Sequence, residues 1–363
     1  MNYREVEIYA PKDLGPAGTE VIDINVIDPL STIELIWQTT VVTAAVMLAP
    51  HVACISKIEL VDGSDVLVGL SGEEAQALAF YSIGRMPLNL ISVKAAEYMK
   101  SVIPIYFGRK LFDRELALDP KRFRNLQLKV TWDEDAANTT VTANQLTVRG
   151  YVFDKRPVSP RGFLMSKEIK SYTPVASGYE YTELATDFPY RLLMLRSKST
   201  TIEPNAALGL VKLSEDNDKR IPLDMTGDEI LQKIVGPMGE IEESFLGADA
   251  VTATDLYGAP TANVQALAEV DADVIATGDD YSQATIVNNK YSWSTAVNCL
   301  YFSFRARGFC PHSCLAIPFG DLNDIEDWYD PKGIGNLRLI TQGAAAVGTS
   351  PSAQVVTQQL RGY

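Results

Sequence analysis

A ten-residue pattern occurs twice in this chain, and it constrains the fold more than any other feature. Residues 119–128 read DPKRFRNLQL, and residues 330–339 read DPKGIGNLRL. Asp, Pro, Lys, Asn and both Leu recur at the same offsets, 211 residues apart. Repeats of about 20 to 50 residues build solenoids or propellers, whereas a spacing as long as a domain indicates a duplicated domain.

Three further pairs of matching segments occur in the same order in both halves. They are Gly18–Pro29 with Gly178–Pro189, SGEE at 71–74 with TGDE at 226–229, and IYFG at 105–108 with IPFG at 317–320. SGEE and TGDE have the S/T-x-x-E form of a capping box, in which hydroxyl and carboxylate satisfy free amides at a helix start. The sequence therefore predicts an internal duplication, with a helix after each capping box.

The spacing between matching segments grows from 155 residues at the capping boxes to 211 at the DPK segments. The second copy therefore carries about fifty extra residues between its helix and its last strands. Residues 240–290 are the candidate, because 240–289 contain ten Asp and Glu but no Lys, Arg or His. A segment of this composition is expected in solvent, as a long loop or tower that contributes little to either core.

Each copy is expected to consist mostly of β-strands. Ile22, Ile24 and Val26 alternate with polar residues, which is the period-2 pattern of a half-buried strand. No strand–helix–strand rhythm recurs, so a parallel doubly wound sheet is disfavoured. Roughly eight short strands fit each half, so the predicted fold is all-β, with a sandwich or a jelly roll in each copy and a few short helices between strands. The boundary is placed at the proline-rich segment 155–163, giving a first roll at 1–157 and a second at 158–363.

Charge and composition exclude several function classes. The formal net charge of -14 argues against direct, sequence-independent nucleic-acid binding, which needs Lys and Arg to replace counterions. No direct, sequence-specific nucleic-acid partner is predicted either. A basic stretch between Lys100 and Lys129 is interpreted as a solvated or interface face. The N-terminal residues lack an apolar signal core, and four cysteines without a regular framework fit a reducing compartment.

Three candidate sites carry weak signals. Cys310, His312 and Cys314, with Cys299 upstream, supply zinc-type ligands but lack a second ligand pair. Residues 271–280, DADVIATGDD, could bind calcium but lack the EF-hand alternation. His51 and His312 are the only histidines, and neither lies in a nucleophile motif. We therefore predict no catalytic, cofactor-binding or metal-binding residue, no cofactor and no enzymatic activity.

The repeated I-x-F-G … D-P … N-L-x-L run, found once in each predicted roll, resembles the double jelly-roll major capsid proteins. These build tail-less icosahedral viruses of the adenovirus, tectivirus and corticovirus lineage. The resemblance implies an all-β fold of two consecutive eight-stranded jelly rolls, with a few short helices in the loops between strands. It also implies a homotrimer of pseudo-hexagonal outline that packs against neighbouring capsomers and against minor capsid or vertex proteins. It also implies a virion location after assembly in the host cytoplasm, a membrane-containing bacteriophage as the expected source, and outward towers that the acidic segment would suit. An internal membrane is compatible with the sequence, which has no basic N-terminal arm.

Two alternatives stay open at the level of sequence. Paired carboxylates are abundant, so a two-domain jelly-roll hydrolase acting on glycans is one of them. The four tryptophans, which would line a glycan cleft, are instead spread over both copies and are expected in the core. The second alternative is a virion spike or decoration protein with the same fold.

Overall fold

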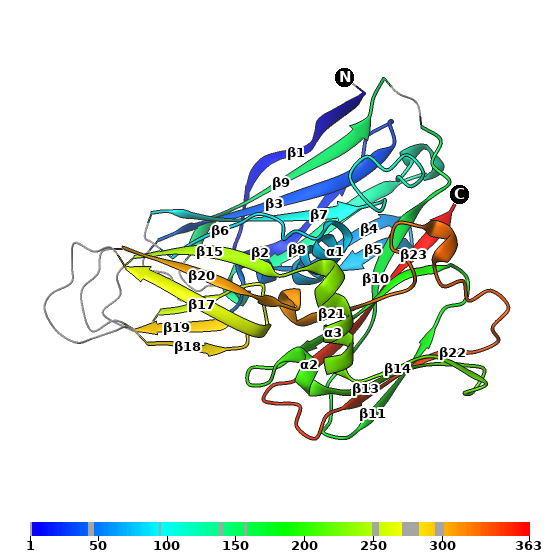
Figure 1. The fold of residues 1–363 in the computed structure, drawn as a ribbon. Coiled ribbons are helices and arrows are strands. Elements are labelled where there is room, and N and C mark those ends of the chain that lie inside the picture. The colour runs from blue at the N-terminus through cyan, green and yellow to red at the C-terminus, as the bar shows by residue number, and fades with distance from the viewer. Residues whose placement is uncertain are drawn as a thin grey trace, which may run out of the picture.

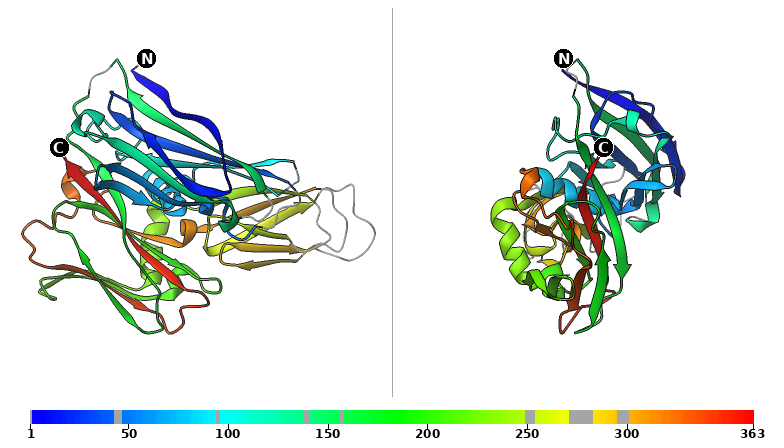
Figure 2. Two further views of the ribbon diagram at one scale, coloured as in Figure 1. Left: turned by 180° about the vertical axis from the view of Figure 1, so that it is seen from behind. Right: turned by 90° about the vertical axis from the view of Figure 1, so that its right-hand side faces the viewer.

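The computed structural model describes residues 2–42, 47–93, 96–137, 141–155, 158–248, 254–270, 283–294 and 301–363. Strands dominate, and the few helices lie between them, as predicted. Both chain termini lie at one end of the molecule, and the strands labelled β17 to β19 lie at the other (Figures 1 and 2).

The first half of the chain forms a jelly roll of two four-stranded layers. One layer has the order β1-β9-β3-β7 and the other has the order β2-β8-β4-β5. The strands are β1 (Tyr3–Leu14), β2 (Ala17–Asp23), β3 (Leu30–Val41), β4 (Ile55–Asp62), β5 (Asp65–Leu70), β7 (Tyr98–Tyr106), β8 (Leu126–Asp133) and β9 (Val141–Phe153). Helix α1 (Gly72–Ile83) and the short strand β6 (Asn89–Ser92) connect β5 to β7.

The second half repeats this arrangement strand for strand. Its layers have the orders β10-β23-β12-β21 and β11-β22-β13-β14. The strands are β10 (Gly162–Tyr172), β11 (Tyr179–Leu184), β12 (Tyr190–Lys198), β13 (Leu208–Glu215), β14 (Arg220–Met225), β21 (Cys314–Pro318), β22 (Leu337–Gly343) and β23 (Ser352–Gly362). The short helix α2 (Pro204–Ala207) precedes β13, and helix α3 (Gly227–Met238) follows β14 as α1 follows β5. The predicted duplication and the predicted fold class are therefore confirmed.

Both predicted helix starts have complete capping boxes. In α1 the backbone N–H of Ser71 donates to Glu74 Oε2 at 2.8 Å, and the N–H of Glu74 donates to Ser71 Oγ at 3.3 Å. In α3 the reciprocal bonds between Thr226 and Glu229 have the same lengths, 2.8 and 3.3 Å. These caps satisfy amides that the helix itself leaves without partners.

The repeated Asp-Pro steps are turns that each precede a strand. The side chain of Asp119 accepts from the N–H of Lys121 at 3.2 Å, and Asp330 accepts from Lys332 at 3.0 Å. Proline fixes its own φ and keeps the preceding Asp extended, so each pair sets a turn before β8 or β22. The short 3₁₀ helices are η1 (His51–Cys54), η2 (Pro120–Arg122), η3 (Glu134–Ala136), η5 (Pro311–Ser313) and η6 (Ile325–Asp327).

The acidic segment lies between α3 and β21, as the spacing predicts, but its described residues are mostly strands and not a solvated loop. Together with β20, which follows the segment, these strands form a unit that we call the insertion, the described residues of 241–309. They are β15 (Ile241–Ala248), β16 (Thr254–Tyr257), β17 (Ala262–Val270), β18 (Gln283–Val287), β19 (Lys290–Ser294) and β20 (Tyr301–Phe309). Its first and last strands pair along their lengths, from Ile241 opposite Gly308 to Ala248 opposite Tyr301.

The insertion also contributes to the core, which corrects the expectation that it would not. Phe245, Leu256, Tyr291, Phe304 and Ala306 are buried, and they form one cluster with residues of the first roll. The first-roll members of that cluster are Val41, Met47, Ile91, Val93, Met99 and Val141. The overall composition conceals this because, in β15, Ile241 and Phe245 lie on the buried face while Glu242 and Ser244 lie on the exposed one.

Two parallel strand pairs join these units into larger sheets. β5 of the first roll pairs with β10 of the second at Val68–Ser166, which produces one eight-stranded sheet. β6 of the first roll pairs with β15 of the insertion at Ile91–Phe245, which produces the other. The insertion belongs to the second copy by sequence, but it therefore extends a sheet of the first roll.

Candidate functional site

A buried polar network lies where α1 meets the second roll. Arg196, on β12, forms an ion pair with Glu73 in the first turn of α1, and Lys198 lies 3.6 Å from the same carboxylate. Burial raises the pKa of Glu73, but the charges of Arg196, Lys198 and His312 outweigh it and hold that pKa at about 2. These charged side chains therefore form a buried ion-pair network between the two rolls, which we call the interlock.

His312, on η5, continues the network along α1. Its Nε2 lies 2.9 Å from Gln76 Oε1, an acceptor, so we assign the ring proton to Nε2. Its Nδ1 is buried without a hydrogen-bond partner among the described residues. Burial lowers the pKa of His312 to about 4, so the imidazole is neutral at pH 7.

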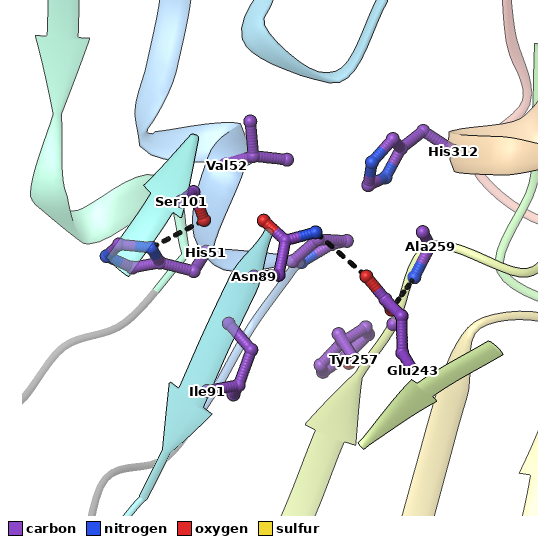
Figure 3. Close-up of a pocket in the computed structure, with 11 residues that line it drawn as sticks. His51, Val52, Asn89, Ile91, Ser101, Glu243, Tyr257, Ala259 and His312 are labelled. Atoms are coloured by element: carbon purple, nitrogen blue, oxygen red, sulfur yellow. Dashed lines mark hydrogen bonds between the residues drawn. The ribbon is translucent and has the colours of Figure 1, made fainter. Parts of the chain in front are cut away.

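The insertion is attached through a carboxylate that accepts two hydrogen bonds. Glu243, on β15, accepts from Asn89 Nδ2 at 2.8 Å and from the N–H of Ala259 at 2.7 Å (Figure 3). Gln76 Nε2 in turn donates to Asn89 Oδ1 at 2.8 Å. Burial raises the pKa of Glu243, against the lowering effect of those two donors. One chain of hydrogen bonds thus links the second roll, α1, β6 and the insertion.

A small cavity lies beside this chain of hydrogen bonds, and His51 lines the side of it opposite His312 (Figure 3). Its Nδ1 lies 2.9 Å from Ser101 Oγ and its Nε2 lies 3.0 Å from Thr39 Oγ1, so both ring nitrogens are used. Burial lowers the pKa of His51 to about 3. The cavity, which Glu243 and His312 also line, has a volume of about 10 Å³, room for about one water molecule.

These dimensions do not suit an active site. Two further cavities among the described residues have volumes of about 10 and 40 Å³, one beside Ser82 and one beside Tyr179. A site for a small organic ligand typically has about 300 to 1,000 Å³. Both carboxylates of this region are already bound, because Glu73 pairs with Arg196 and Glu243 accepts from two N–H donors.

The structure places the weak metal candidates in the core or leaves them outside its description. Cys310, His312 and Cys314 are buried, and burial raises the pKa of both thiols, which disfavours the thiolate form that zinc needs. Among the described residues, no group of three or more His, Cys, Asp or Glu could hold a metal. Cys299 and the calcium candidate, residues 271–280, lie outside the described residues. Trp37, Trp132 and Trp328 are buried, as expected.

A surface of a different kind lies on the outer side of the sheet that joins β7, β6, β15, β20 and β17. Five large apolar side chains are exposed there, by 41 to 63%. We call this set the apolar face; its members are Leu88, Leu90, Tyr98, Leu246 and Leu267. Leu246 points away from its buried neighbour Phe245, as strand alternation requires. Contiguous exposed apolar patches on soluble proteins typically mark interaction surfaces.

None of these contacts could be found from local sequence signals. Glu73 and Arg196 are 123 residues apart, Asn89 and Glu243 are 154 apart, and Gln76 and His312 are 236 apart. The sequence does give the helix that carries Glu73 and Gln76, because its capping box is recognisable. The placing of Ile241 and Phe245 on one face of a strand, with Glu242 and Ser244 on the other, is the signal that could have indicated a strand in the acidic segment.

Comparisons with known proteins give matches in structure but not in sequence. No family model matches this chain, and no curated protein sequence does. The major capsid protein of STIV, Sulfolobus Turreted Icosahedral Virus, matches with a TM-score of 0.62 at 9% identity, over 99% of this chain and 96% of that one. The major capsid protein P2 of bacteriophage PM2 matches with a TM-score of 0.53 at 11% identity, over 99% and 100%. The PBCV-1 virus capsid matches with a TM-score of 0.58 at 9% identity, over 99% and 93%.

The fold is the double jelly roll of viral major capsid proteins. The matches span both rolls and almost the whole of each relative, so the likeness is one of complete architecture. At 9 to 11% identity it establishes the fold alone. Within the described residues, no helix is long and apolar enough to cross a membrane.

Proposed function

We propose that this protein is the major capsid protein of an icosahedral virion and that it self-assembles as homotrimers of pseudo-hexagonal outline. The observation that carries the proposal is the duplicated architecture, two rolls with the same strand order in both layers. Three copies of such a chain supply six similar rolls, and six similar rolls can close a ring of nearly hexagonal outline. Proteins with this fold include major capsid proteins from bacteriophage PM2 and from STIV.

The apolar face supports self-association. Its five side chains lie on one side of a sheet, where water solvates them in the isolated chain. Burying them against another copy would remove apolar surface from water at about 25 cal/mol per Å². Lys100, whose Nζ lies 5.4 Å from the ring centroid of Tyr98, adds a charged group at the margin of that face. Arg305, which lies opposite Leu267, and its ion-pair partner Glu242 add further charged groups to the same face. Protein–protein interfaces typically contain both apolar and polar area.

The protein acts without catalysis in this proposal. The described cavities are too small for a sugar ring, and the buried carboxylates serve the interlock between the rolls. The rolls divide at 157/158, and the insertion forms the outward tower. The remaining partners are minor capsid or vertex proteins and an internal membrane. The protein is located in the virion after assembly in the host cytoplasm.

The decisive experiment measures mass and shape in solution. Light scattering after size-exclusion chromatography should give three times the chain mass of 39.8 kDa, and negative-stain images should show particles of hexagonal outline. The double variant Leu246→Ser, Leu267→Ser should shift the mass towards the monomer. The matched control Val175→Ser removes an apolar side chain that is 67% exposed on the second roll, and it should leave the trimer intact.

Other results would remove the proposal. A wild-type protein that stays monomeric at high concentration would contradict the trimer. Hydrolysis of a glycan panel that is lost when Glu243 is replaced by Gln would favour the hydrolase. A trimer that binds preassembled shells without forming them would favour a spike or decoration protein.

A further inference from the structure

The two loops that carry the repeated DPK pattern have opposite charges. Loop 1, residues 107–125 between β7 and β8, contains six Lys and Arg against three Asp and Glu. Loop 2, residues 319–336 between β21 and β22, contains five Asp and Glu against one Lys. These loops occupy equivalent positions in the two rolls, so duplicated segments have acquired complementary charge.

Much of this charge is exposed and without an ion-pair partner among the described residues. In loop 1 these side chains are Lys110, Arg114, Lys121 and Arg124, and in loop 2 they are Asp321, Asp324, Asp327 and Asp330. The aspartates accept hydrogen bonds only from backbone N–H groups of their own loop. Like charges gathered in one loop repel each other, so each loop is better stabilised beside the opposite charge.

Within one chain the two loops already meet on one side. Arg109, in loop 1, donates to the carbonyl of Asn323, in loop 2, at 2.7 Å. Arg161, in the connection between the rolls, lies 3.1 Å from Glu326. Both loops are at the end of the molecule that holds the chain termini: the hydroxyl of the C-terminal Tyr363 accepts from the N–H of Asp119 at 2.6 Å (Figure 1). The contact between basic and acidic loop therefore exists once per chain.

We propose that this contact is repeated between copies, so that loop 1 of one copy packs beside loop 2 of the next. The inference rests on the proposed trimer, because a closed ring of alternating rolls gives every loop 1 a loop 2 on both sides. Such an interface is heterologous: each copy contributes a basic surface to one neighbour and an acidic surface to the other. The six loops then alternate in sign around the ring.

This arrangement determines which rolls become neighbours more than how tightly they bind. Exposed ion pairs contribute only about 0 to 1 kcal/mol each, so burial of apolar surface has to supply most of the affinity. Two first rolls or two second rolls side by side would oppose like charges, which costs several kcal/mol at an interface. Complementary loops thus favour strict alternation of the rolls, which a trimer of two-roll chains requires.

An anionic membrane is the other partner that a basic loop could bind. The neighbouring acidic loop argues against it, because four unpaired aspartates at the same end of the molecule would be repelled by anionic lipid. A second copy of this chain supplies an opposite charge to both loops, whereas an anionic membrane supplies one to loop 1 alone.

The test compares charge reversal in each loop with reversal of both. Lys121→Glu with Arg124→Glu reverses two charges of loop 1, and Asp321→Lys with Asp324→Lys reverses two charges of loop 2. The trimer dissociation constant, from light scattering in 0.1 M NaCl, should rise at least about tenfold in each double variant and should recover when all four changes are combined. In 0.5 M NaCl the wild-type constant should also rise, because salt screens exposed pairs.

The controls separate this inference from the proposed function. Asp321→Asn with Asp324→Asn keeps the oxygens that accept from Asn323 and Glu326, so it weakens the trimer without loss of the local turns. Lys57→Glu with Lys233→Glu makes the same charge change outside both loops and should have little effect.

Trimers that resist every loop variant would overturn the inference but leave the proposed function intact. A monomeric wild type would remove both. If wild-type protein floats with phosphatidylglycerol vesicles, and the loop 1 variant does not float but still forms normal trimers, the partner of loop 1 is lipid.

Discussion

Glu73 in the first roll and Arg196 in the second form an ion pair in the interior of the molecule, although 123 residues separate them. Both side chains are less than a tenth exposed, and the guanidinium also donates from Nε to the carbonyl of His312 at 3.2 Å. Charges in such a place are stable only when they are paired and hydrogen-bonded. Each charge can therefore be buried without a large free-energy cost only when the two rolls are docked correctly.

Removing one partner of this pair should be strongly destabilising. Glu73→Ala leaves the Arg196 guanidinium buried with its partner missing, and we expect a loss of about 3–5 kcal/mol in the free energy of unfolding. Urea denaturation monitored by tryptophan fluorescence would measure it. Asp28→Ala breaks the exposed pair with Arg4 and should cost no more than about 1 kcal/mol.

The double variant Glu73→Leu, Arg196→Met tests whether the loss of stability in Glu73→Ala comes from the buried charge of Arg196 that is left without its partner. Replacing both charges by apolar groups removes the desolvation cost together with the attraction, so the double variant should be more stable than Glu73→Ala. If the double variant is as unstable as the single one, the missing partner is not the cause of the loss.

The two buried histidines should make stability depend on pH in the acid range. Burial lowers the pKa of His51 to about 3 and that of His312 to about 4, against about 6.5 in an unfolded chain. The unfolded chain therefore binds these protons first as the pH falls. Stability is complete above pH 6.5 and declines from there towards pH 4, by about 1.4 kcal/mol per pH unit for each histidine.

Unfolding curves at pH 6.5, 5.5 and 4.5 would measure that slope. The variant His51→Gln, His312→Gln should show a smaller slope, because an amide does not titrate in this range. Glu73 contributes with the same sign but only below about pH 4.5, where its carboxyl begins to bind a proton in the unfolded chain. Glu243 and Glu74, whose pKa values are raised, oppose the histidines in both proteins and therefore cancel in the comparison. An unchanged slope would mean that neither imidazole is held neutral.

The sequence predicts those parts of the fold that depend on neighbouring residues. The capping boxes at Ser71 and Thr226, the turns at Asp119 and Asp330, and the two jelly rolls follow from short patterns and from their repetition. Such signals are local, so one sequence is enough to find them.

The contacts between units could not be predicted in the same way. Nothing near Asn89 indicates that Glu243 will bind it, and the acidic composition of residues 240–290 conceals the buried face of β15. Burial depends on which sheet a strand joins, and that is decided by packing across the whole molecule. The charge difference between loops 1 and 2 is visible in the sequence. That the two loops can face each other between copies follows only from the structure, which places both at one end of the molecule.

The repeated turns offer a matched pair of stability tests. Pro120→Ala and Pro331→Ala each release a fixed φ in equivalent turns, and each should lower the free energy of unfolding by about 1 kcal/mol, chiefly through greater freedom of the unfolded chain. Thermal unfolding followed by calorimetry would measure both. Similar losses would confirm that the two copies use the turn in the same way. A variant that is as stable as the wild type would show that its turn does not depend on proline.

The hydrogen bond from Asn89 to Glu243 gives a way to loosen the insertion without deleting it. Asn89→Asp replaces the donor by a second carboxylate beside Glu243, and two carboxylates at that distance resist ionising together. We expect a loss of about 1–3 kcal/mol at pH 8, together with faster amide exchange in β15 and β16 than in β3. At pH 5 one carboxyl can hold a proton and donate to the other, so much of the loss should be recovered.

Asn89→Ala also removes the donor but introduces no second acid, so its effect should change less between the two pH values. Equal exchange rates in β15 for Asn89→Asp and wild type at pH 8 would show that the buried apolar cluster around Phe245 holds the insertion without help from this bond.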